Sequence, residues 1–306
     1  MANRVQRARP TPVALAAEQA ALAALIVQEQ LPSDYRATID DHWRPIAAAI
    51  AAAFAAAGRP LVIGINGAQG SGKSTLCLCL ELLLRHSHGL HAQTLSIDDL
   101  YLSKADRGKL AAAVHPLLAM RGVPGTHDVD LGNHIIASVQ AGHARLQLPR
   151  FDKGRDDRVP SADWPIAAKP IDILLFEGWC VAASPQPALA LAMPVNRLEI
   201  DDDKDMIWRR HVNTALAGPY RALFANIDLL VMLAAPRFEI VQDWRLIQEH
   251  KLRARTNGGM TDAELSRFVM HFERLTRHML DEMPSRVTIL VALDDQHRVS
   301  KLAIRP

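Results

Sequence analysis

Five apolar runs, separated by segments with helical spacing, set the pattern of hydrophobic and polar positions along this chain. Each run is short and continuous, which is typical of strands buried on both faces of a parallel sheet. The first run begins at Leu61, and the others cover residues 93–97, 171–178, 227–233 and 286–293. Helical patterns follow the first run and cover residues 131–141, 201–217 and 238–255. Strands that alternate with helices predict an α/β fold with one parallel five-stranded sheet and helices on both faces.

Residues 12–57 precede the first run and are rich in alanine at helical spacing. A break at residues 31–34 divides them, and Pro45 is compatible with the first turn of a helix that continues to Phe54. We therefore expect residues 1–58 to form an N-terminal helical extension and residues 59–306 to form the domain that contains the sheet. The extension either packs on that domain as part of its core or offers its helices to a protein partner.

The composition argues against several classes of protein. A net charge of +2 in 306 residues gives no global reason to expect binding to nucleic acid or to a membrane surface. The sequence has no run of about 18 apolar residues, so no transmembrane helix is predicted. The three cysteines form neither a disulfide framework nor a metal-ligand spacing, which favours a reducing, cytoplasmic setting.

The first apolar run leads into a glycine-rich turn and an apolar helix, and the turn matches a phosphate-binding loop. Gly67 is followed after four residues by Gly72-Lys73-Ser74, which is the P-loop spacing. Its N–H groups and the start of the helix favour phosphate, while Lys73 can reach the β- and γ-phosphates and Ser74 can bind Mg²⁺. The sequence lacks the guanine-reading motif N-K-x-D, which favours ATP. The residues expected to hold the nucleotide are Gly67, Ala68, Gln69, Gly70, Ser71, Gly72, Lys73, Ser74 and Thr75.

Two carboxylates stand at the ends of predicted strands, where parallel strands open onto a ligand-binding crevice. Asp98 follows residues 93–97, and we expect it to be the general base that takes the proton from an acceptor hydroxyl. The alternative is that Asp98 or Asp99 caps the next turn. Glu177 lies at the end of the buried run 171–178 and is expected to hold Mg²⁺ together with Ser74.

Polar and basic segments near these strand ends are candidates for the acceptor site. Residues 104–132 are rich in glycine, proline and histidine, which favours contact with substrate over a passive connection. Residues 148–158 carry three arginines and a lysine, which form either an anion clamp or a solvated charge cluster. The basic helix at 238–255 is a candidate lid, and we expect Arg245 to neutralise charge in the transition state. Residues 257–259 are predicted to end that helix, and Thr261 to begin a capping box for the next.

Several of these segments occur together, and in the same order, in a known superfamily. The phosphate loop, residues 96–101, residues 149–152 with Arg158, and residues 176–178 resemble the uridine kinase, phosphoribulokinase and pantothenate kinase superfamily. More narrowly, the chain resembles the plant-type D-glycerate 3-kinase group over roughly residues 60–295. The segments that carry this resemblance are 125–128 (GTHD), 150–153 (RFDK), 176–179 (FEGW), 243–246 (DWRL) and 259–262 (GMTD).

The resemblance implies a P-loop kinase with a sheet like that of the nucleoside monophosphate kinases, which transfers the γ-phosphoryl group of ATP to a small-molecule hydroxyl. It also implies Asp98 as the base, Glu177 near Mg²⁺ and the basic helix at 238–255 as a lid, and we expect Lys73 and Arg245 to be further catalytic residues. The residues it implies at the acceptor are Thr126, His127, Asp128, Asp152 and Arg158, and we expect Tyr101 to contact the acceptor as well.

We expect the acceptor to be a small anionic molecule, with D-glycerate the first candidate, because its carboxylate needs a cationic partner. The available groups are His127, Lys153, Arg155 and Arg158. The same groups could hold pantothenate or a sugar phosphate, and a nucleoside kinase is a further alternative. A nucleotide-gated regulatory protein, whose N-terminal helices bind a partner, is an alternative of a different class.

Overall fold

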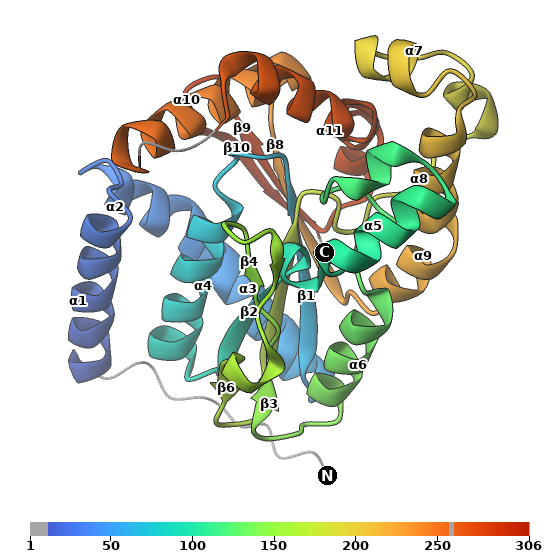
Figure 1. The fold of residues 1–306 in the computed structure, drawn as a ribbon. Helices are drawn as coiled ribbons and strands as arrows, with labels where there is room; N and C mark the ends of the chain where they lie inside the picture. Colours follow the sequence, from blue (N-terminus) through green and yellow to red (C-terminus); the bar gives the residue numbers. More distant parts are fainter. Residues whose placement is uncertain (1–11, 257–259, 306) are drawn as a thin grey trace.

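The computed structural model describes residues 12–256 and 260–305, and a six-stranded sheet lies at its centre (Figure 1). The strand order is β10-β9-β8-β1-β7-β2, in which five strands are parallel and the edge strand β10 is antiparallel. The strands are β1 (Leu61–Gly67), β2 (Ala92–Ser96), β7 (Ile173–Gly178), β8 (Leu229–Ala234), β9 (Ile289–Leu293) and β10 (Val299–Ile304). The α/β fold and its five parallel strands are therefore confirmed.

Helices cover both faces of the sheet. On one face lie α1 (Pro12–Gln28), α2 (Tyr35–Thr38), the π-helical turn η1 (Ile39–Trp43), α3 (Arg44–Ala57), α4 (Lys73–His88) and α10 (Phe238–Thr256). The other face is covered by α6 (Val129–Gln140), α8 (Ile207–Ala217) and α9 (Pro219–Phe224), and α11 (Asp262–Glu282) contributes to both. The remaining elements are α5 (Lys104–Ala113), α7 (Arg197–Asp202), two short strand pairs, β3 (Leu146–Gln147) with β6 (Ile166–Ala167) and β4 (Phe151–Asp152) with β5 (Asp157–Arg158), and short 3₁₀ turns.

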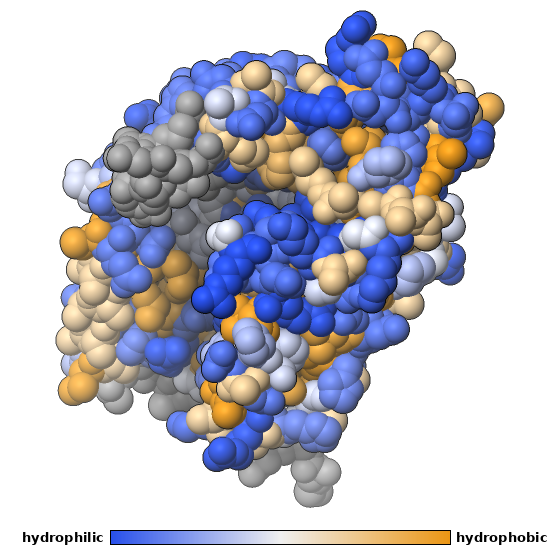
Figure 2. All heavy atoms as spheres, in the orientation of Figure 1, coloured by the Kyte–Doolittle hydropathy of each residue, from blue (hydrophilic) through white to orange (hydrophobic). Residues whose placement is uncertain are grey.

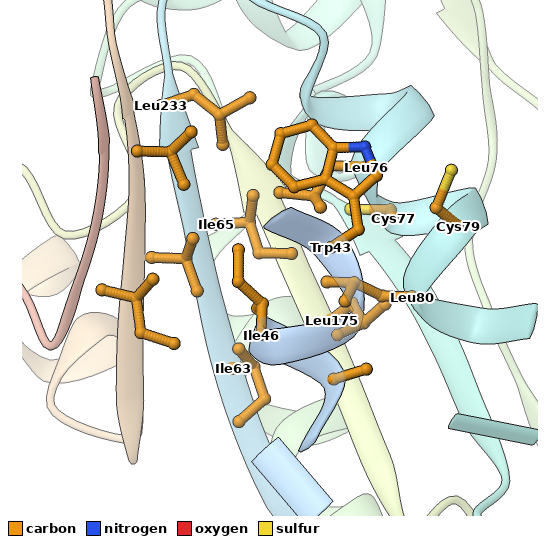
Figure 3. Packing of buried hydrophobic residues seen from close by; sticks show 14 of the residues in the cluster. Trp43, Ile46, Ile63, Ile65, Leu76, Cys77, Cys79, Leu80, Leu175 and Leu233 are labelled. Atoms are coloured by element: carbon orange, nitrogen blue, oxygen red, sulfur yellow. The ribbon is translucent and has the colours of Figure 1, made fainter. Parts of the chain in front are cut away.

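Successive side chains of the central strands enter opposite cores, as the period of two in a strand requires. Ile63 and Ile65 of β1 face α3 and α4, whereas Val62 belongs to the cluster under α6 and α9. Figure 3 shows Ile46 beside the two isoleucines and Trp43 beside Leu76 and Cys77 of α4. The apolar runs of the sequence are continuous because both faces of these strands are buried.

Several elements differ from the sequence prediction: residues 104–132, expected to be a loop, begin with α5, and the short pairs β3–β6 and β4–β5 were not predicted. The strand β10 was not predicted, because Ser300 and Lys301 interrupt its apolar positions, which are only partly buried on this edge of the sheet. The helix predicted at 201–217 begins later, at Ile207 of α8, and its first two residues are instead the end of α7. Asp203 breaks it: its buried carboxylate accepts from the Trp208 N–H (2.8 Å) and pairs with Arg209 (2.9 Å), which starts a new helix at this point.

The N-terminal helices are part of the core rather than an appendage. Leu22 and Leu25 of α1 are buried in the same cluster as the side chains of α4. Glu18, also buried, forms an ion pair with Arg44 of α3 (2.8 Å) and accepts a hydrogen bond from Ser87 at the end of α4. A buried carboxylate is tolerated only where such partners satisfy it, so α1 is held in one position against α3 and α4.

Deletion of residues 1–55 is therefore expected to give an insoluble or unfolded protein, because it uncovers the apolar side of α4 and one face of the sheet. Circular dichroism and size-exclusion chromatography would measure this.

A pair of point variants within α1 tests the packing of this helix: replacing the fully buried Leu22 by alanine should lower the free energy of unfolding by about 2–5 kcal/mol. Replacing the exposed Val27 by alanine should cost less than about 0.5 kcal/mol. A folded deletion that keeps its activity would instead favour a partner-binding role.

Among the described residues, no helix is both long and apolar enough to cross a membrane. The cysteines Cys77, Cys79 and Cys180 are free and buried. Burial raises the pKa of each thiol, that of Cys79 to about 12, so these side chains act as apolar core residues rather than as nucleophiles.

Candidate active site

A cleft of about 1000 Å³ opens at the carboxyl ends of β1, β7 and β2, where a parallel sheet is expected to bind its ligand. Its central wall is the P-loop, with Gln69, Gly70, Lys73 and Ser74. Figure 2 shows hydrophilic side chains gathered over α5 and β4, the strand that leads to Lys153 at this cleft. The other described residues that line it are Glu29, Gln30, Ser96, Asp98, Tyr101, Arg121, Lys153, Glu177, Gly178, Trp179, Arg245, Phe268 and Phe272.

The P-loop has a geometry that fits a phosphate group. Gly70 has a positive φ of 78°, and a Cβ on Gly67 would lie 2.6 Å from Ser71 Oγ, so neither position accommodates a side chain without strain. Lys73 begins α4, and its Nζ donates to the carbonyl of Ala68 (3.1 Å). The Ser71 hydroxyl is buried and has no hydrogen-bond partner among the described residues. An unpartnered hydroxyl beside the N-terminus of a long helix suits an anion.

The start of α10 and the β9–β10 turn hold the P-loop from outside. A Cβ on Gly70 would lie 3.1 Å from Cβ of Trp244, and the indole of Trp244 stacks on His297 with ring centroids 3.8 Å apart. His297 Nε2 donates to the carbonyl of Gly70 (2.8 Å). The antiparallel strand that the sequence did not predict therefore positions the turn that supports the loop.

Arg245, the expected lid arginine, lines the cleft from α10. Its guanidinium pairs with the buried carboxylate of Glu249 (2.8 Å) and lies 5.9 Å from the ring centroid of Phe268. Phosphate contact would require Arg245 to share or exchange this partner. The predicted helix end at 257–259 lies outside the described residues, whereas the capping box at Thr261 and Glu264 is confirmed.

Asp98 follows β2 and lies in the cleft with both carboxylate oxygens in contact with protein groups. The Tyr101 hydroxyl donates to Oδ1 (2.8 Å), and the Lys153 ammonium lies 2.7 Å from Oδ2. Burial opposes ionisation of Asp98, but the charge and hydrogen bond of Lys153 outweigh it and hold the pKa below its usual value. Asp98 is therefore a carboxylate at neutral pH.

Glu177 lies opposite Ser96 in the register of β7 and β2, so its carboxylate is at the same end of the sheet as Asp98. Burial raises the pKa of Glu177, while the ammonium of Lys73 acts in the opposite direction. Ser74 lines the same cleft. One hydroxyl and one carboxylate suit Mg²⁺, which keeps water and phosphate oxygens as its other ligands. Within the described part of the chain, no cluster of three His, Cys, Asp or Glu forms a metal cage of its own.

Asp99 is not among the residues that line the cleft, and it anchors the β4–β5 hairpin. Its carboxylate accepts from the Phe151 N–H (3.1 Å) and pairs with Arg150 (3.2 Å). The alternative in which Asp99 caps the following turn is therefore wrong, because its oxygens are engaged by the hairpin. Asp98 therefore lies at the cleft, and Asp99 holds in place the hairpin that carries Lys153.

Of the six residues expected at the acceptor, Tyr101 alone lines the cleft among the described residues. His127 lies directly behind it, with the two rings stacked and their centroids 4.6 Å apart. The Tyr220 hydroxyl accepts from the Gly125 N–H (3.0 Å) and bonds to His127 Nδ1, while Nε2 of the buried histidine has no hydrogen-bond partner within the described ranges. His127 therefore supports the ring of Tyr101 from the interior.

The other four residues have protein partners behind the cleft wall, which differs from the expectation that they face the acceptor. Thr126 is fully buried, and its hydroxyl donates to a nearby carbonyl (2.7 Å). Asp128 caps the first turn of α6 (3.0 Å) and accepts from Arg158 (3.2 Å). Asp152 closes the hairpin turn by accepting two backbone N–H groups. Arg158 donates through its terminal nitrogens to Asp128 and to the Tyr101 carbonyl (2.9 Å), so the main polar contacts of these four residues are made with the protein itself.

Arg121 is a charged cleft residue that the sequence did not single out. Its guanidinium pairs with Asp156, donates to the carbonyl of Lys153 (3.4 Å) and lies 5.5 Å from the ring centroid of Phe151. It therefore stands beside Lys153 and adds a second positive charge on the side of the cleft that contains Asp98. Its only sequence signal is its place within the segment 104–132, which was expected to contact substrate.

The buried His127 predicts a loss of stability in acid. Burial lowers its pKa to about 4, whereas the unfolded chain binds this proton near pH 6.5. Between pH 6.5 and pH 4 the histidine is protonated in the unfolded state but not in the folded state. The free energy of unfolding therefore falls as the pH falls. In urea titrations, the stability of the wild type relative to His127→Gln is expected to fall by about 3 kcal/mol from pH 7 to pH 4. A difference that does not change with pH would contradict this account.

Comparison with known proteins places this arrangement in context. No protein-family model matches the chain. The uncharacterized kinase mug58 of Schizosaccharomyces pombe is 37% identical over 224 residues, which cover 70% of this chain and 79% of that protein. The chloroplastic D-glycerate 3-kinase of Arabidopsis thaliana is 32% identical over 222 residues, which cover 70% of this chain but only 46% of the plant enzyme. The solved structure of D-glycerate 3-kinase from Cryptococcus neoformans matches with a TM-score of 0.68 and 29% identity, covering 80% of this chain and 90% of that one.

Proposed function

This chain belongs to the P-loop kinase family that includes D-glycerate 3-kinase and is a phosphotransferase with a hydroxyl acceptor; we propose that it transfers the γ-phosphoryl group of ATP to D-glycerate. The observation that carries this proposal is the cleft in which a P-loop, the ionised Asp98 and the cations Lys153 and Arg121 lie together. A base beside a phosphate site indicates transfer to a hydroxyl, and the two cations favour an acceptor that carries a carboxylate.

In the proposed reaction, the P-loop N–H groups and Lys73 hold the β- and γ-phosphates, and Arg245 approaches from α10. Asp98 accepts the proton of the acceptor hydroxyl, whose oxygen forms the new bond to phosphorus as the bond to ADP breaks. Ser74 and Glu177 would hold Mg²⁺, which supplies positive charge to the phosphate oxygens. The protein contributes mainly position and electrostatic stabilisation, which is what phosphoryl transfer requires.

For the acceptor, the structure supports a smaller contact set than the one implied by the sequence motifs. Tyr101, Arg121 and Lys153 border the space next to Asp98. Lys153 is already 2.7 Å from Asp98, so a carboxylate that binds Lys153 would bring its neighbouring hydroxyl close to the base. D-Glycerate has a carboxylate and hydroxyl groups within this short span. We propose that His127 and Arg158 act indirectly, by fixing Tyr101, since Arg158 donates to the Tyr101 carbonyl (2.9 Å).

An assay of ADP release across D-glycerate, pantothenate, uridine and ribulose 5-phosphate tests this proposal. We expect turnover that depends on the acceptor and is fastest with D-glycerate. Faster turnover with another of these compounds would reassign the substrate while keeping the reaction class. No stimulation by any hydroxyl compound would contradict the proposed reaction.

Lys153→Met is expected to change both acceptor binding and pH dependence. The Lys153 ammonium holds the pKa of Asp98 down, so its removal should raise that pKa and move the acidic limb of kcat/KM to higher pH. Loss of a charge-assisted hydrogen bond should raise the KM for the acceptor by about tenfold or more. Lys109→Met, at an exposed lysine on α5 outside the cleft, is the matched control and should change neither quantity. If the acidic limb of kcat/KM stays at the same pH in Lys153→Met, the ionisation of Asp98 does not determine that limb.

A further inference from the structure

The end of α1 has an unusual residue at a position that normally favours glycine. Gln30 has a positive φ of 52°, its N–H donates to the Val27 carbonyl (3.2 Å), and the next N–H, of Leu31, donates to the Ile26 carbonyl (3.0 Å). These two hydrogen bonds form a helix-ending motif in which the left-handed residue is usually glycine, because a Cβ makes this conformation unfavourable. A side chain kept at such a position raises the question of what it contacts.

Gln30 and its neighbour Glu29 are exposed to the cleft rather than to the outer surface alone. Both line it together with Gln69, Gly70 and Lys73 of the P-loop. The buried residues of α1 and the ion pair between Glu18 and Arg44 hold the helix against α3 and α4. The helix therefore presents these two side chains at a fixed place beside the P-loop.

The direction of the nucleotide follows from what lies on each side of the P-loop. The γ-phosphate must face Asp98 and Lys153, because the acceptor meets it there. The α-phosphate and the nucleoside must then extend the opposite way along the cleft. In Figure 1 the first turn of α4 lies between the α1–α2 turn, where Glu29 and Gln30 are found, and β4. The end of α1 therefore borders the part of the cleft that receives the nucleoside.

We propose that Glu29 and Gln30 bind the nucleoside half of the donor nucleotide and that the N-terminal extension is thus part of the nucleotide site. The carboxamide of Gln30 offers one donor and one acceptor group, which suits the edge of a purine base. The carboxylate of Glu29 accepts hydrogen bonds from ribose hydroxyls and would repel a phosphate. This inference rests on the proposed use of a nucleoside triphosphate as the donor.

Titration calorimetry with no acceptor present tests the inference. With Mg²⁺ in all solutions, the ligands are ATP and inorganic tripolyphosphate, which has the three phosphates but no nucleoside. Gln30→Ala and Gln30→Gly should each weaken ATP about three- to tenfold and leave tripolyphosphate unchanged. Gln30→Gly should also melt no lower than the wild type, because glycine relieves the left-handed backbone. Gln28→Ala, at an exposed glutamine on the same helix outside the cleft, should bind both ligands as the wild type does.

The proposed contact between Glu29 and the ribose is tested separately, by comparing the affinities for ATP and 2′-deoxy-ATP. The wild type should bind ATP more tightly than 2′-deoxy-ATP, and Glu29→Gln should narrow that ratio by about threefold or more. Unchanged ATP affinity in both Gln30 variants, or an equal loss of ATP and tripolyphosphate, would overturn the inference. A wild type that binds ATP but phosphorylates no acceptor would overturn the proposed function alone. A wild type that binds no ATP would overturn both.

Discussion

Asp98→Asn is expected to lower kcat by about 10²–10⁴-fold while ATP still binds. Asparagine keeps the shape of the side chain and can still accept from the Tyr101 hydroxyl, but its amide cannot take a proton from the acceptor. It also ends the charge pairing with Lys153, whose ammonium lies 2.7 Å from the carboxylate. Steady-state kinetics with ATP and the acceptor would measure kcat, and calorimetry would measure ATP affinity.

Asp99→Asn provides the matched control, because the neighbouring carboxylate binds Arg150 and the Phe151 N–H instead of facing the cleft. We expect it to lower the melting temperature more than kcat. Full turnover in Asp98→Asn would assign the base role to another group. A similar loss of kcat in both variants would indicate a disturbed hairpin rather than a lost base.

Lys73→Ala is expected to weaken ATP binding and to lower kcat by about 10²–10³-fold, the range seen when one donor to transition-state charge is removed. Lys73 is the first residue of α4, and its ammonium donates to the Ala68 carbonyl. The ammonium therefore already lies over the loop that receives the phosphates. Alanine is a good helix former, so α4 should remain intact. ATP titrations and kinetics would measure the two effects, with circular dichroism to check the fold.

Lys73→Arg separates charge from shape, because the guanidinium keeps the charge but is larger and planar. We expect it to retain more ATP affinity than Lys73→Ala and to recover little of kcat. A rate unaffected in Lys73→Ala would contradict the assignment of the P-loop.

The features that the sequence predicted well are those determined by a short, continuous segment of the chain. The P-loop spacing around Gly67 and Lys73 reports a local turn followed by a helix, so it can be recognised without knowledge of the rest of the fold. The buried strands are similar, because burial on both faces forces a continuous apolar run. Asp98 and Glu177 could be placed in the cleft because the end of a parallel strand fixes where its last side chain lies.

What the sequence did not predict depends on pairing between distant segments. Residues 148–158 were expected to form an anion clamp or a solvated charge cluster, but Arg158 pairs with Asp128 and Arg150 pairs with Asp99 inside the protein. Neither the pairings nor the place of Arg121 has a local pattern. The edge strand β10 depends on β9 for its hydrogen bonds and carries little apolar signal of its own. The contact of α1 with the cleft likewise appears only when the helix is packed on α4.

The ion pair between Lys153 and Asp98 also bears on the fate of ATP when no acceptor is present. Both carboxylate oxygens of Asp98 already accept from protein groups, Oδ1 from the Tyr101 hydroxyl and Oδ2 from the Lys153 ammonium, so Asp98 would activate a water molecule beside the γ-phosphate poorly. With Asp98 as the base, ATP bound alone would be spared from futile hydrolysis. An anionic acceptor offers Lys153 a second partner, which would free Asp98 as the hydroxyl arrives. The ion pair between Lys153 and Asp98 would therefore make the consumption of ATP depend on the presence of an acceptor.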